Sequence, residues 1–240
     1  MPVERYFLRE SLHPHETKTL KGTEFHHLAH VMRTRKGDEI ELVNGQGVLA
    51  QAIVQEIRKD QAHLLVQSAT QEKPGTKQVI LAQAMPKLNR LDYILEKGTE
   101  LGVDAFWLFP GQLSVKKEFQ GNQLERLQAI LISAMKQCGR LYLPTLEIKP
   151  ALDQWQNVEG TLFFGDVEEK APLFAHAFEE KSLSFPIIFC TGPESGLTAA
   201  EINHLKALGA QGVKLHQSIL RTDTASIAAL ALIQHWLLAM

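Results

Sequence analysis

The sequence predicts an α/β protein: a parallel sheet with helices on both faces, preceded by a smaller β-rich domain. Residues 5–69 mostly alternate apolar and polar side chains with the period of a strand. From Val79 onward, short apolar runs alternate with helical patterns instead. A polar segment containing Pro74–Gly75 separates the two regions. We therefore expect two domains, at residues 1–72 and 73–240.

Composition is that of an ordinary globular protein, with 45% hydrophobic residues and a net charge of -2 over 240 residues. This charge argues against a protein that coats nucleic acid with its whole surface. The start of the chain has no apolar leader, and the apolar segment from Ile227 to Leu238 is too short to span a bilayer. We therefore expect a cytoplasmic protein without a membrane anchor. Cys138 and Cys190 are far apart and indicate neither a disulfide nor a zinc site.

Charge is unevenly distributed at the beginning of the chain. Residues 1–36 contain seven Lys and Arg against four Glu, an excess of three positive charges, together with five of the ten His. Residues 37–72 are acidic, with two Lys and Arg against six acids. A basic end on a neutral body is compatible with a nucleic-acid contact face and also with an ordinary solvated surface.

The first region should form a small β-barrel or curled sheet. Strands are expected near Tyr6–Leu8 and over 39–43, 48–57 and 62–69. Asn44–Gly47 between two of these runs predicts a hairpin, because Asn and Gly tolerate the positive φ that tight turns require.

A helix is expected within this region, with Thr23 as its N-cap and its end near Arg35. His26 and His30 would share one face of it, at the spacing used by some zinc proteases. His27 stands where such a motif needs a glutamate, and no third ligand is evident, so we expect no metal site.

The second region predicts strands and helices in alternation. Strands are expected at 79–84, 105–109, near Leu146, and at 162–164, 187–190 and 213–215. Helices are expected at 89–101, 122–138 and 172–178, from a capping box at Thr198, and from Asp223. In the 122–138 helix, the apolar face should contain Leu124, Leu127, Ile130, Leu131 and Ala134. Ligands of such folds gather at the carboxyl ends of the parallel strands.

Two loops near the end of the chain are the candidate walls of a site. Thr191–Gly196 is a glycine-rich turn after an apolar strand, and Arg221 directly precedes the last helix. The chain has no dinucleotide fingerprint, no P-loop, and no correctly spaced serine nucleophile motif. The turn could hold a ligand or be a plain connection. Arg221 could bind an anion or form a structural ion pair with Glu194 or Asp223.

Several separate motifs, in order along the whole chain, resemble the RsmE-type ribosomal RNA uridine-N3 methyltransferases of the SPOUT superfamily. They are Arg5–Phe7, His27–Arg33, Gly37–Asp38, Lys97–Val103, Gln137–Arg140, Pro144, Gly192–Glu201 and Leu215–Ala225. The resemblance implies a PUA-like β-barrel followed by a trefoil-knotted α/β domain, an exception to the rule that chains are not knotted. It also implies a homodimer that binds S-adenosylmethionine in the knot and methylates small-subunit (16S) ribosomal RNA in an assembled subunit.

Carried over to this sequence, the resemblance implies cofactor contacts in three loops. They are Phe164, Gly165, Thr191, Gly192, Pro193, Glu194, Gly196, Leu215, Ser218, Ile219 and Leu220. Three positions depart from the family pattern, which has glycine at Ser195 and His216 and glutamate at Asp223. Ser195 fits the turn only if its φ is negative, and His216 could narrow the cofactor site.

The implied reaction assigns further roles. Uridine N3 must be unpaired and lose its proton before it attacks the methyl group. Arg221 is the candidate to stabilise the resulting anion, and Glu194 or Asp223 the candidate proton acceptor, with solvent as the alternative. Candidate RNA contacts are Arg5, Arg9, His30, Arg33, Arg35 and Lys36. A methyltransferase for another RNA, or an RNA-binding protein without catalysis, are the alternatives.

Overall fold

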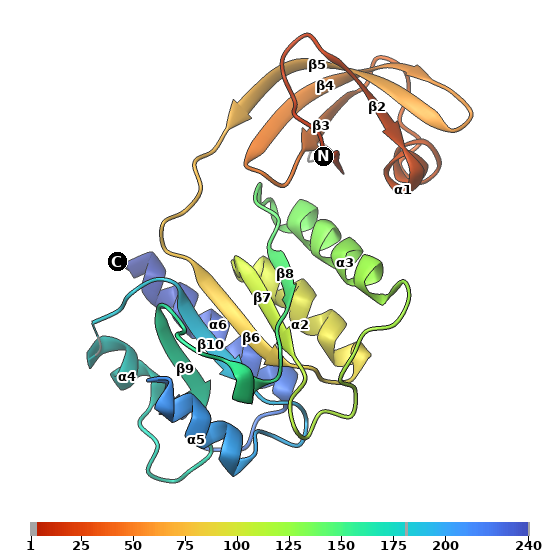
Figure 1. Cartoon of the computed structure of the whole chain (residues 1–240). Helices are drawn as coiled ribbons and strands as arrows, with labels where there is room; N and C mark the ends of the chain where they lie inside the picture. Colours follow the sequence, from red (N-terminus) through yellow and green to blue (C-terminus); the bar gives the residue numbers. More distant parts are fainter. Residues whose placement is uncertain (1–3, 181, 240) are drawn as a thin grey trace. The chain divides into compact units, whose positions relative to one another are not determined.

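The computed structural model describes residues 4–180 and 182–239 of the chain (Figure 1). Met1–Val3, at the beginning of the given sequence, lie outside the described residues. The chain divides into two compact units. One comprises the residues up to Pro74 together with Met135–Leu143, and the other comprises Gly75–Ala134 and the chain from Pro144 onward.

The first unit is built on a curled five-stranded sheet. Its strands are β1 (Arg5–Phe7), β2 (Thr17–Lys21), β3 (Glu39–Val43), β4 (Val48–Ile57) and β5 (Gln61–Gln71), in the order β1-β3-β4-β5-β2. Strand β1 is parallel to β3, and the other pairs are antiparallel. Within the described residues β1 and β2 do not pair, so the sheet is an open half-barrel. The sequence prediction lacked β2, a short edge strand with a single buried residue, Leu20.

The predicted hairpin between β3 and β4 is confirmed. The side-chain Oδ1 of Asn44 accepts hydrogen bonds from the main-chain N–H groups of Gln46 and Val48, at 2.8 and 3.2 Å. Gly45 and Gly47 adopt φ of 72° and 90°. The side chain of Asn44 therefore closes the turn, and the glycines supply the left-handed conformations it needs.

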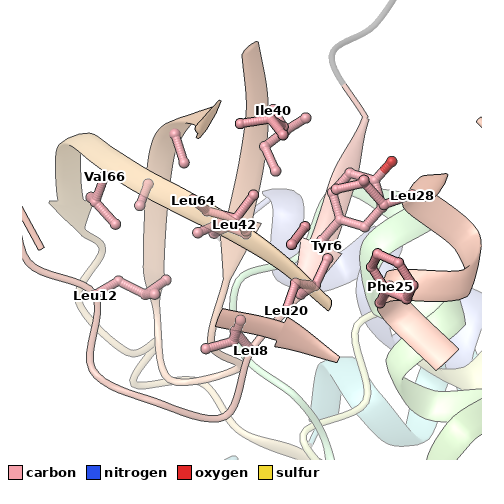
Figure 2. Close-up of a cluster of buried hydrophobic side chains, with 14 residues drawn as sticks. Tyr6, Leu8, Leu12, Leu20, Phe25, Leu28, Ile40, Leu42, Leu64 and Val66 are labelled. Carbon is pink, nitrogen blue, oxygen red and sulfur yellow. The ribbon is translucent and has the colours of Figure 1, made fainter. Parts of the chain in front are cut away.

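The helical segment of the first unit differs from the prediction at both ends. Helix α1 (Gly22–His26) begins before Thr23, with Lys21 at the N-cap and no side-chain capping bond. It continues as a π-helical turn, η1 (His27–Val31), and ends well before Arg35. Phe25 and Leu28 are buried in a cluster with Tyr6 and strand residues such as Leu42 (Figure 2). Burial of this apolar side, and not a cap, anchors the segment.

Residues 135–143 complete the first unit from far along the sequence. The main-chain N–H of Gly47 donates to the oxygen of Leu141, and that of Leu143 donates to the oxygen of Gly45, both at 2.9 Å. The Nζ of Lys136 lies 2.7 Å from a carboxylate oxygen of Glu24. This segment is therefore hydrogen-bonded into the unit.

The second unit is built on a six-stranded sheet in which every pair is parallel, as predicted. Its strands are β6 (Val79–Ala84), β7 (Ala105–Phe109), β8 (Thr145–Ile148), β9 (Thr161–Gly165), β10 (Ile187–Thr191) and β11 (Gln211–Val213). They lie in the order β11-β9-β10-β6-β7-β8. The last strand ends at Val213, so Leu215, expected inside it, belongs to the following loop.

Helices cover both faces of this sheet (Figure 1). They are α2 (Leu88–Glu100), α3 (Gln123–Cys138), α4 (Phe174–Glu180), α5 (Ala199–Ala207) and α6 (Thr222–Ala239), with a short 3-10 turn η2 (Leu152–Gln154). Ala82 of β6 clusters with Leu205 of α5 and Leu152 of η2, whereas the next residue, Gln83, hydrogen-bonds to Ser226 of α6. Successive strand residues face opposite sides, so α5 and α6 cover opposite faces.

Two helix predictions can be judged from side chains. The capping box of α5 is confirmed: the hydroxyl of Thr198 accepts from the Glu201 main-chain N–H, and the Glu201 carboxylate accepts from that of Thr198. In α3, Leu127, Leu131 and Ala134 are buried as expected, but Leu124 is 39% exposed and does not belong to the apolar face. Leu124 lies in the first turn, before the helix reaches its buried stretch.

The chain then returns from the sheet edge to the sheet centre. Strand β11 lies at one edge, yet α6, which follows it, packs against β10, β6 and α2. Such a return path fits the expected trefoil-knotted topology. Among the described residues, no helix is both long and apolar enough to cross a membrane.

Candidate functional site

Three loops meet at the carboxyl edge of the parallel sheet. They follow β11, β9 and β10, which are neighbours in the sheet. Because all three strands are parallel, their carboxyl ends lie at one edge. The sequence-predicted cofactor residues fall at these ends: Phe164 and Gly165 close β9, Thr191 closes β10 and precedes Gly192, Pro193, Glu194 and Gly196, and Leu215, Ser218, Ile219 and Leu220 follow β11.

The glycine-rich turn after β10 is a close-packed bend. A Cβ on Gly192 would lie 2.8 Å from both the carbonyl carbon of Gly196 and the nitrogen of Leu197, so only glycine fits there without a backbone shift. Gly196 adopts a φ of +78°. Ser195 is not among the residues with positive φ, so serine is compatible with its position. The turn thus uses its two glycines for two different reasons.

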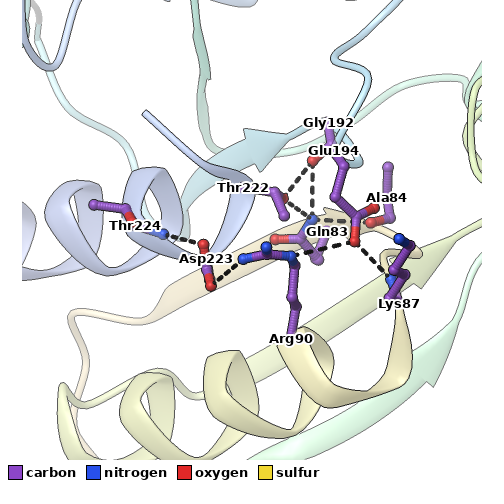
Figure 3. A network of polar contacts seen from close by, with 9 residues as sticks. All are labelled: Gln83, Ala84, Lys87, Arg90, Gly192, Glu194, Thr222, Asp223 and Thr224. Atoms are coloured by element: carbon purple, nitrogen blue, oxygen red, sulfur yellow. Dashed lines mark hydrogen bonds and ion pairs between the residues drawn. The ribbon is translucent and has the colours of Figure 1, made fainter. Parts of the chain in front are cut away.

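A buried glutamine joins this turn to the last helix (Figure 3). Gln83 of β6 is fully buried, and its Nε2 lies 3.1 Å from the main-chain oxygen of Gly192 and 3.0 Å from Oγ1 of Thr222. The Thr222 hydroxyl itself donates to the Gly192 oxygen at 2.6 Å. The hydroxyl of Ser226 lies 2.7 Å from Oε1 of Gln83. Both ends of the carboxamide are therefore satisfied, as a buried polar group requires.

An arginine that the sequence reasoning did not single out contacts both candidate acids (Figure 3). In α2, Nη1 of Arg90 lies 2.6 Å from Oδ2 of Asp223, and its Nε lies 3.5 Å from Oε1 of Glu194. The same Glu194 oxygen accepts the main-chain N–H of Lys87 at 3.0 Å. Arg90, and not Arg221, is therefore the ion-pair partner of these two acids.

Arg221 is exposed and stands directly before α6. Within the part of the chain that the structure describes, its side chain makes no hydrogen bond and no ion pair. A guanidinium in this state is available to an anionic ligand, because it carries a full charge and five donor hydrogens. The observed geometry therefore leaves the anion-binding interpretation of Arg221 in place.

The loop between β11 and α6 offers main-chain groups to a ligand. Among residues 215–220, and counting only acceptors within the described ranges, Ser218 alone has a main-chain N–H with a partner, which is Nδ1 of His216 at 3.0 Å. His216 is exposed, and Ile219 is 83% exposed. His216 therefore folds back on its own loop, and the remaining N–H groups are free to bind a cofactor.

One buried hydroxyl at the site also lacks a partner. Thr191 is 6% exposed, and its Oγ1 has no hydrogen-bond partner among the described residues. An orphaned buried hydroxyl and unpartnered main-chain amides at the same edge of the sheet suit a ligand with several polar groups, such as an adenine and an amino acid. The residues present thus fit S-adenosylmethionine.

Cys190 precedes this threonine in β10 and is fully buried. Burial, with a smaller contribution from Glu201, raises the pKa of its thiol far above the ordinary value. A thiol held in its neutral form is a poor nucleophile. Cys190 is therefore an apolar filler of the strand.

The predicted RNA-facing residues are not equivalent. Arg9, His30, Arg33, Arg35 and Lys36 are exposed. Arg33 adopts a φ of 55°, just after the end of η1. Arg5 differs, because its Nε and Nη2 donate to Oε2 of Glu41 at 2.9 and 2.8 Å, and its side chain is 19% exposed. Arg5 is thus engaged within its own unit, between β1 and β3.

Sequence reasoning missed Gln83, Arg90, Thr222 and Ser226. A glutamine inside the apolar run Val79–Ala84, all of whose residues are buried, was a usable signal, since a buried amide needs partners. Arg90 carried no such signal, because arginines on helices are usually solvated.

Comparisons with known proteins agree with this geometry. Residues 72–234 match the family described as RNA methyltransferase domain, and residues 20–67 match the RNA methyltransferase PUA domain. The chain is 30% identical over 248 residues to the ribosomal RNA small subunit methyltransferase E of Bacillus subtilis, covering 97% of this chain and 96% of that protein. It is 33% identical to the same enzyme of Synechocystis over 219 residues, covering 90% and 72% respectively.

A solved structure gives the same result. The ribosomal RNA small subunit methyltransferase E of Neisseria gonorrhoeae, crystallised with S-adenosyl methionine, superposes with a TM-score of 0.86 at 29% identity and covers 98% of each chain. The expected fold class is thereby confirmed. The matched domains, the full-length relatives and the shared architecture lead to one conclusion: the chain belongs to the family of the ribosomal RNA small subunit methyltransferases E.

Proposed function

We propose that this protein transfers the methyl group of S-adenosylmethionine to N3 of a uridine in small-subunit (16S) ribosomal RNA. Family membership supports the reaction class and the RNA. The observation that carries the proposal is the set of three loops at the carboxyl edge of β11, β9 and β10. These loops hold main-chain N–H groups in 215–220, and the Thr191 hydroxyl ends β10, and none of these groups except the N–H of Ser218 has a partner among the described residues. Residues 1–72 would dock RNA, and residues 73–240 would perform the transfer.

The chain's own residues would hold the cofactor in the three loops. When bound, S-adenosylmethionine supplies an electrophilic methyl group on a sulfonium centre. The hydroxyl of Thr191 and the main chain of Gly192 are suited to its polar groups, and the loop from Leu215 to Leu220 is suited to its adenine. Gln83 and Thr222 contribute by fixing the Gly192 carbonyl, so that the turn is pre-organised before binding.

Arg221 is proposed to stabilise the uridine anion. N3 carries a proton and lies on the base-pairing edge, so the base must be unpaired and the proton lost before N3 attacks. The negative charge then spreads over N3, O2 and O4, and Arg221, whose side chain has no partner among the described residues, would stabilise it. Glu194 and Asp223 stay candidate proton acceptors, together with solvent. Protonation of either acid would weaken its ion pair with Arg90.

RNA docking is assigned to the first unit. Arg9, Arg33, Arg35 and Lys36 are exposed cations, and His30 is exposed beside them in sequence. Cations of this kind bind phosphates and fix the orientation of the RNA without reading its sequence. Arg5, already paired with Glu41, would act indirectly by supporting β1. We further propose a homodimer that acts in the cytoplasm on an assembled small subunit.

A methylation assay tests the proposal. Small subunits, free 16S RNA and transfer RNA, all from a strain that lacks this protein, are incubated with S-adenosylmethionine labelled in the methyl group. We expect label in the small subunit and 3-methyluridine in its digested RNA by mass spectrometry. Label in transfer RNA instead would favour another substrate. No label in any RNA, and no heat when S-adenosylmethionine is titrated in a calorimeter, would leave an RNA-binding protein without catalysis.

A further inference from the structure

We propose that Arg90 is a positioning residue that holds the glycine-rich turn against the first turn of α6 by neutralising Glu194 and Asp223 together. The inference rests on the methyl transfer proposed above and deepens it. It gives a role to a side chain that acts through other residues of the site. Arg90 belongs to the first turn of α2, so it joins a third element to the two that it bridges.

The geometry of the guanidinium suits this role. Its Nη1 lies 2.6 Å from Oδ2 of Asp223 and its Nε lies 3.5 Å from Oε1 of Glu194. The planar guanidinium is a fixed, delocalised charge, so its Nη1 can donate a hydrogen bond to Asp223 while the same group forms an ion pair with Glu194 of a separate loop. The side chain of Arg90 is 21% exposed, against 55% for that of Arg126 in α3, which pairs with Asp92 of α2. The two Arg90 contacts are thus more shielded from water.

Charge makes the bridge necessary. Both carboxylates contact one guanidinium, Asp223 at 2.6 Å and Glu194 at 3.5 Å. Two carboxylates that share one cation repel each other, and partial burial strengthens the repulsion. In the described part of the chain, Arg90 is the only cation in contact with both. Removing it would leave the two negative charges at the junction of the turn and α6 without their shared cation.

The junction determines where the active groups lie. Thr222 and Gly192 meet at this point through a 2.6 Å hydrogen bond. Arg221 directly precedes Thr222, and the loop 215–220 ends there. A turn displaced from α6 would therefore move the cofactor loops and Arg221 at once. Loss of Arg90 should weaken cofactor binding even though Arg90 is not assigned to the cofactor contacts.

A charge-rescue experiment tests this role. The variants are Arg90→Gln, Arg90→Gln combined with Asp223→Asn, and Arg90→Lys, with Arg126→Gln as the matched control. Asparagine keeps Oδ1, which accepts the main-chain N–H of Thr224. The probe is S-adenosylhomocysteine, which is S-adenosylmethionine without its methyl group. Its affinity is measured by calorimetry, and the urea midpoint of unfolding is measured on the same samples.

We expect Arg90→Gln to bind S-adenosylhomocysteine about tenfold more weakly, the factor that a charge-assisted pair of ordinary strength implies. Adding Asp223→Asn should restore most of the affinity and of the urea midpoint, because the repulsion is gone. Arg90→Lys should fall between, since lysine keeps the charge and loses the fork. Arg126→Gln should bind like the unaltered protein.

Two results would overturn the inference. Unchanged affinity and midpoint in Arg90→Gln would mean that the ion pairs of Arg90 stabilise neither the junction nor the cofactor site. A double variant no better than Arg90→Gln would mean that Arg90 acts by packing or by touching the ligand, and not by neutralising the acids. If the unaltered protein gave no heat with S-adenosylhomocysteine, the proposed function would fail, and the urea midpoints would still decide whether Arg90 braces the junction.

Discussion

The side-chain amide of Gln83 in β6 donates a hydrogen bond to the main-chain oxygen of Gly192, 3.1 Å away, across 109 positions of sequence. The contact joins β6, one of the two middle strands of the parallel sheet, to the turn that defines the candidate cofactor site. Since Gln83 is fully buried, its partners cannot be replaced by water without opening the fold.

Replacing Gln83 by Leu should destabilise the protein by about 1–3 kcal/mol, because buried polar groups of Gly192, Thr222 and Ser226 would lose a partner. The measurement is the free energy of unfolding in urea. Gln128→Ala, at an exposed position of α3, is the matched control and should leave it unchanged. Equal stability of Gln83→Leu would show that the network contributes nothing to the fold.

Replacing Gly192 by Ala should force the glycine-rich turn to shift, because the new Cβ would lie 2.8 Å from main-chain atoms of Gly196 and Leu197. We expect a loss of about 1–3 kcal/mol in stability, typical of overpacking, and weaker binding of S-adenosylmethionine in calorimetry. Gly75→Ala adds a methyl group in open space and serves as the control. Normal binding by Gly192→Ala would remove this turn from the cofactor site.

Replacing Arg221 by Ala should lower the rate of methyl transfer by about 10²–10³-fold, the effect of removing one stabilising donor from a developing anion. Affinity for S-adenosylmethionine should change little, since the side chain has no partner among the described residues. Single-turnover rates and calorimetry separate the two quantities, with Lys206→Ala on α5 as the control. Equal losses of both would identify Arg221 as a cofactor or structural residue.

Reversing the charges of Arg9 and Arg35 to Glu should weaken RNA binding and reduce its dependence on salt, because fewer phosphate counterions are released. Binding to 16S RNA is measured at several salt concentrations, and S-adenosylmethionine binding is measured alongside and should not change. Lys170→Glu with Lys206→Glu makes the same charge change in the second unit. If the two double variants lost RNA affinity equally, the assignment of docking to the first unit would be wrong.

The buried Tyr6 should make stability dependent on alkaline pH. Burial, opposed by its contact with Thr34 and assisted by Glu4 and Glu24, raises the pKa of its phenol above the ordinary value of 10.0. The folded state therefore holds this proton more tightly than the unfolded state. The stabilisation that the protonated Tyr6 phenol contributes to the folded state is complete below pH 10, and it is lost as the pH rises through the folded-state pKa.

Urea unfolding at pH 8 to 11 tests this linkage. The unaltered protein should lose stability over the upper part of this range, and Tyr6→Phe should lose less. Tyr93→Phe, at a residue 47% exposed, is the control and should follow the unaltered protein. Parallel curves for Tyr6→Phe and the unaltered protein would show that the phenol does not ionise with unfolding.

Much of the fold was predictable because its signals are local. The strands Val79–Ala84 and Ala105–Phe109 match their predicted bounds, since each is a short apolar run between polar breaks. The capping box at Thr198 was readable for the same reason. The predictions failed at positions where tertiary contacts outweigh the local sequence signal. Thr23 is a good cap by type, yet the helix begins at Gly22, with its apolar residues held by the core.

The site was predictable in its loops and not in its polar network. Glycine spacing indicated the turn from Thr191 to Gly196, because glycine is used where other residues cannot fit. The pairing of Arg90 with Glu194 and Asp223 joins residues more than a hundred positions apart. No periodicity encodes such a contact, which arises only when α2 and α6 pack on the same face of the sheet.

The segment 135–143 has a consequence for how the protein is made. The first unit includes these residues, which supply hydrogen bonds to Gly45 and Gly47 of the β3–β4 hairpin. During synthesis the chain emerges from its N-terminus onward. The β-rich unit therefore cannot be completed when its own sheet has left the ribosome, and must wait until residue 143 has followed. Expression of residues 1–74 alone would yield a fragment that lacks the segment 135–143 of its unit.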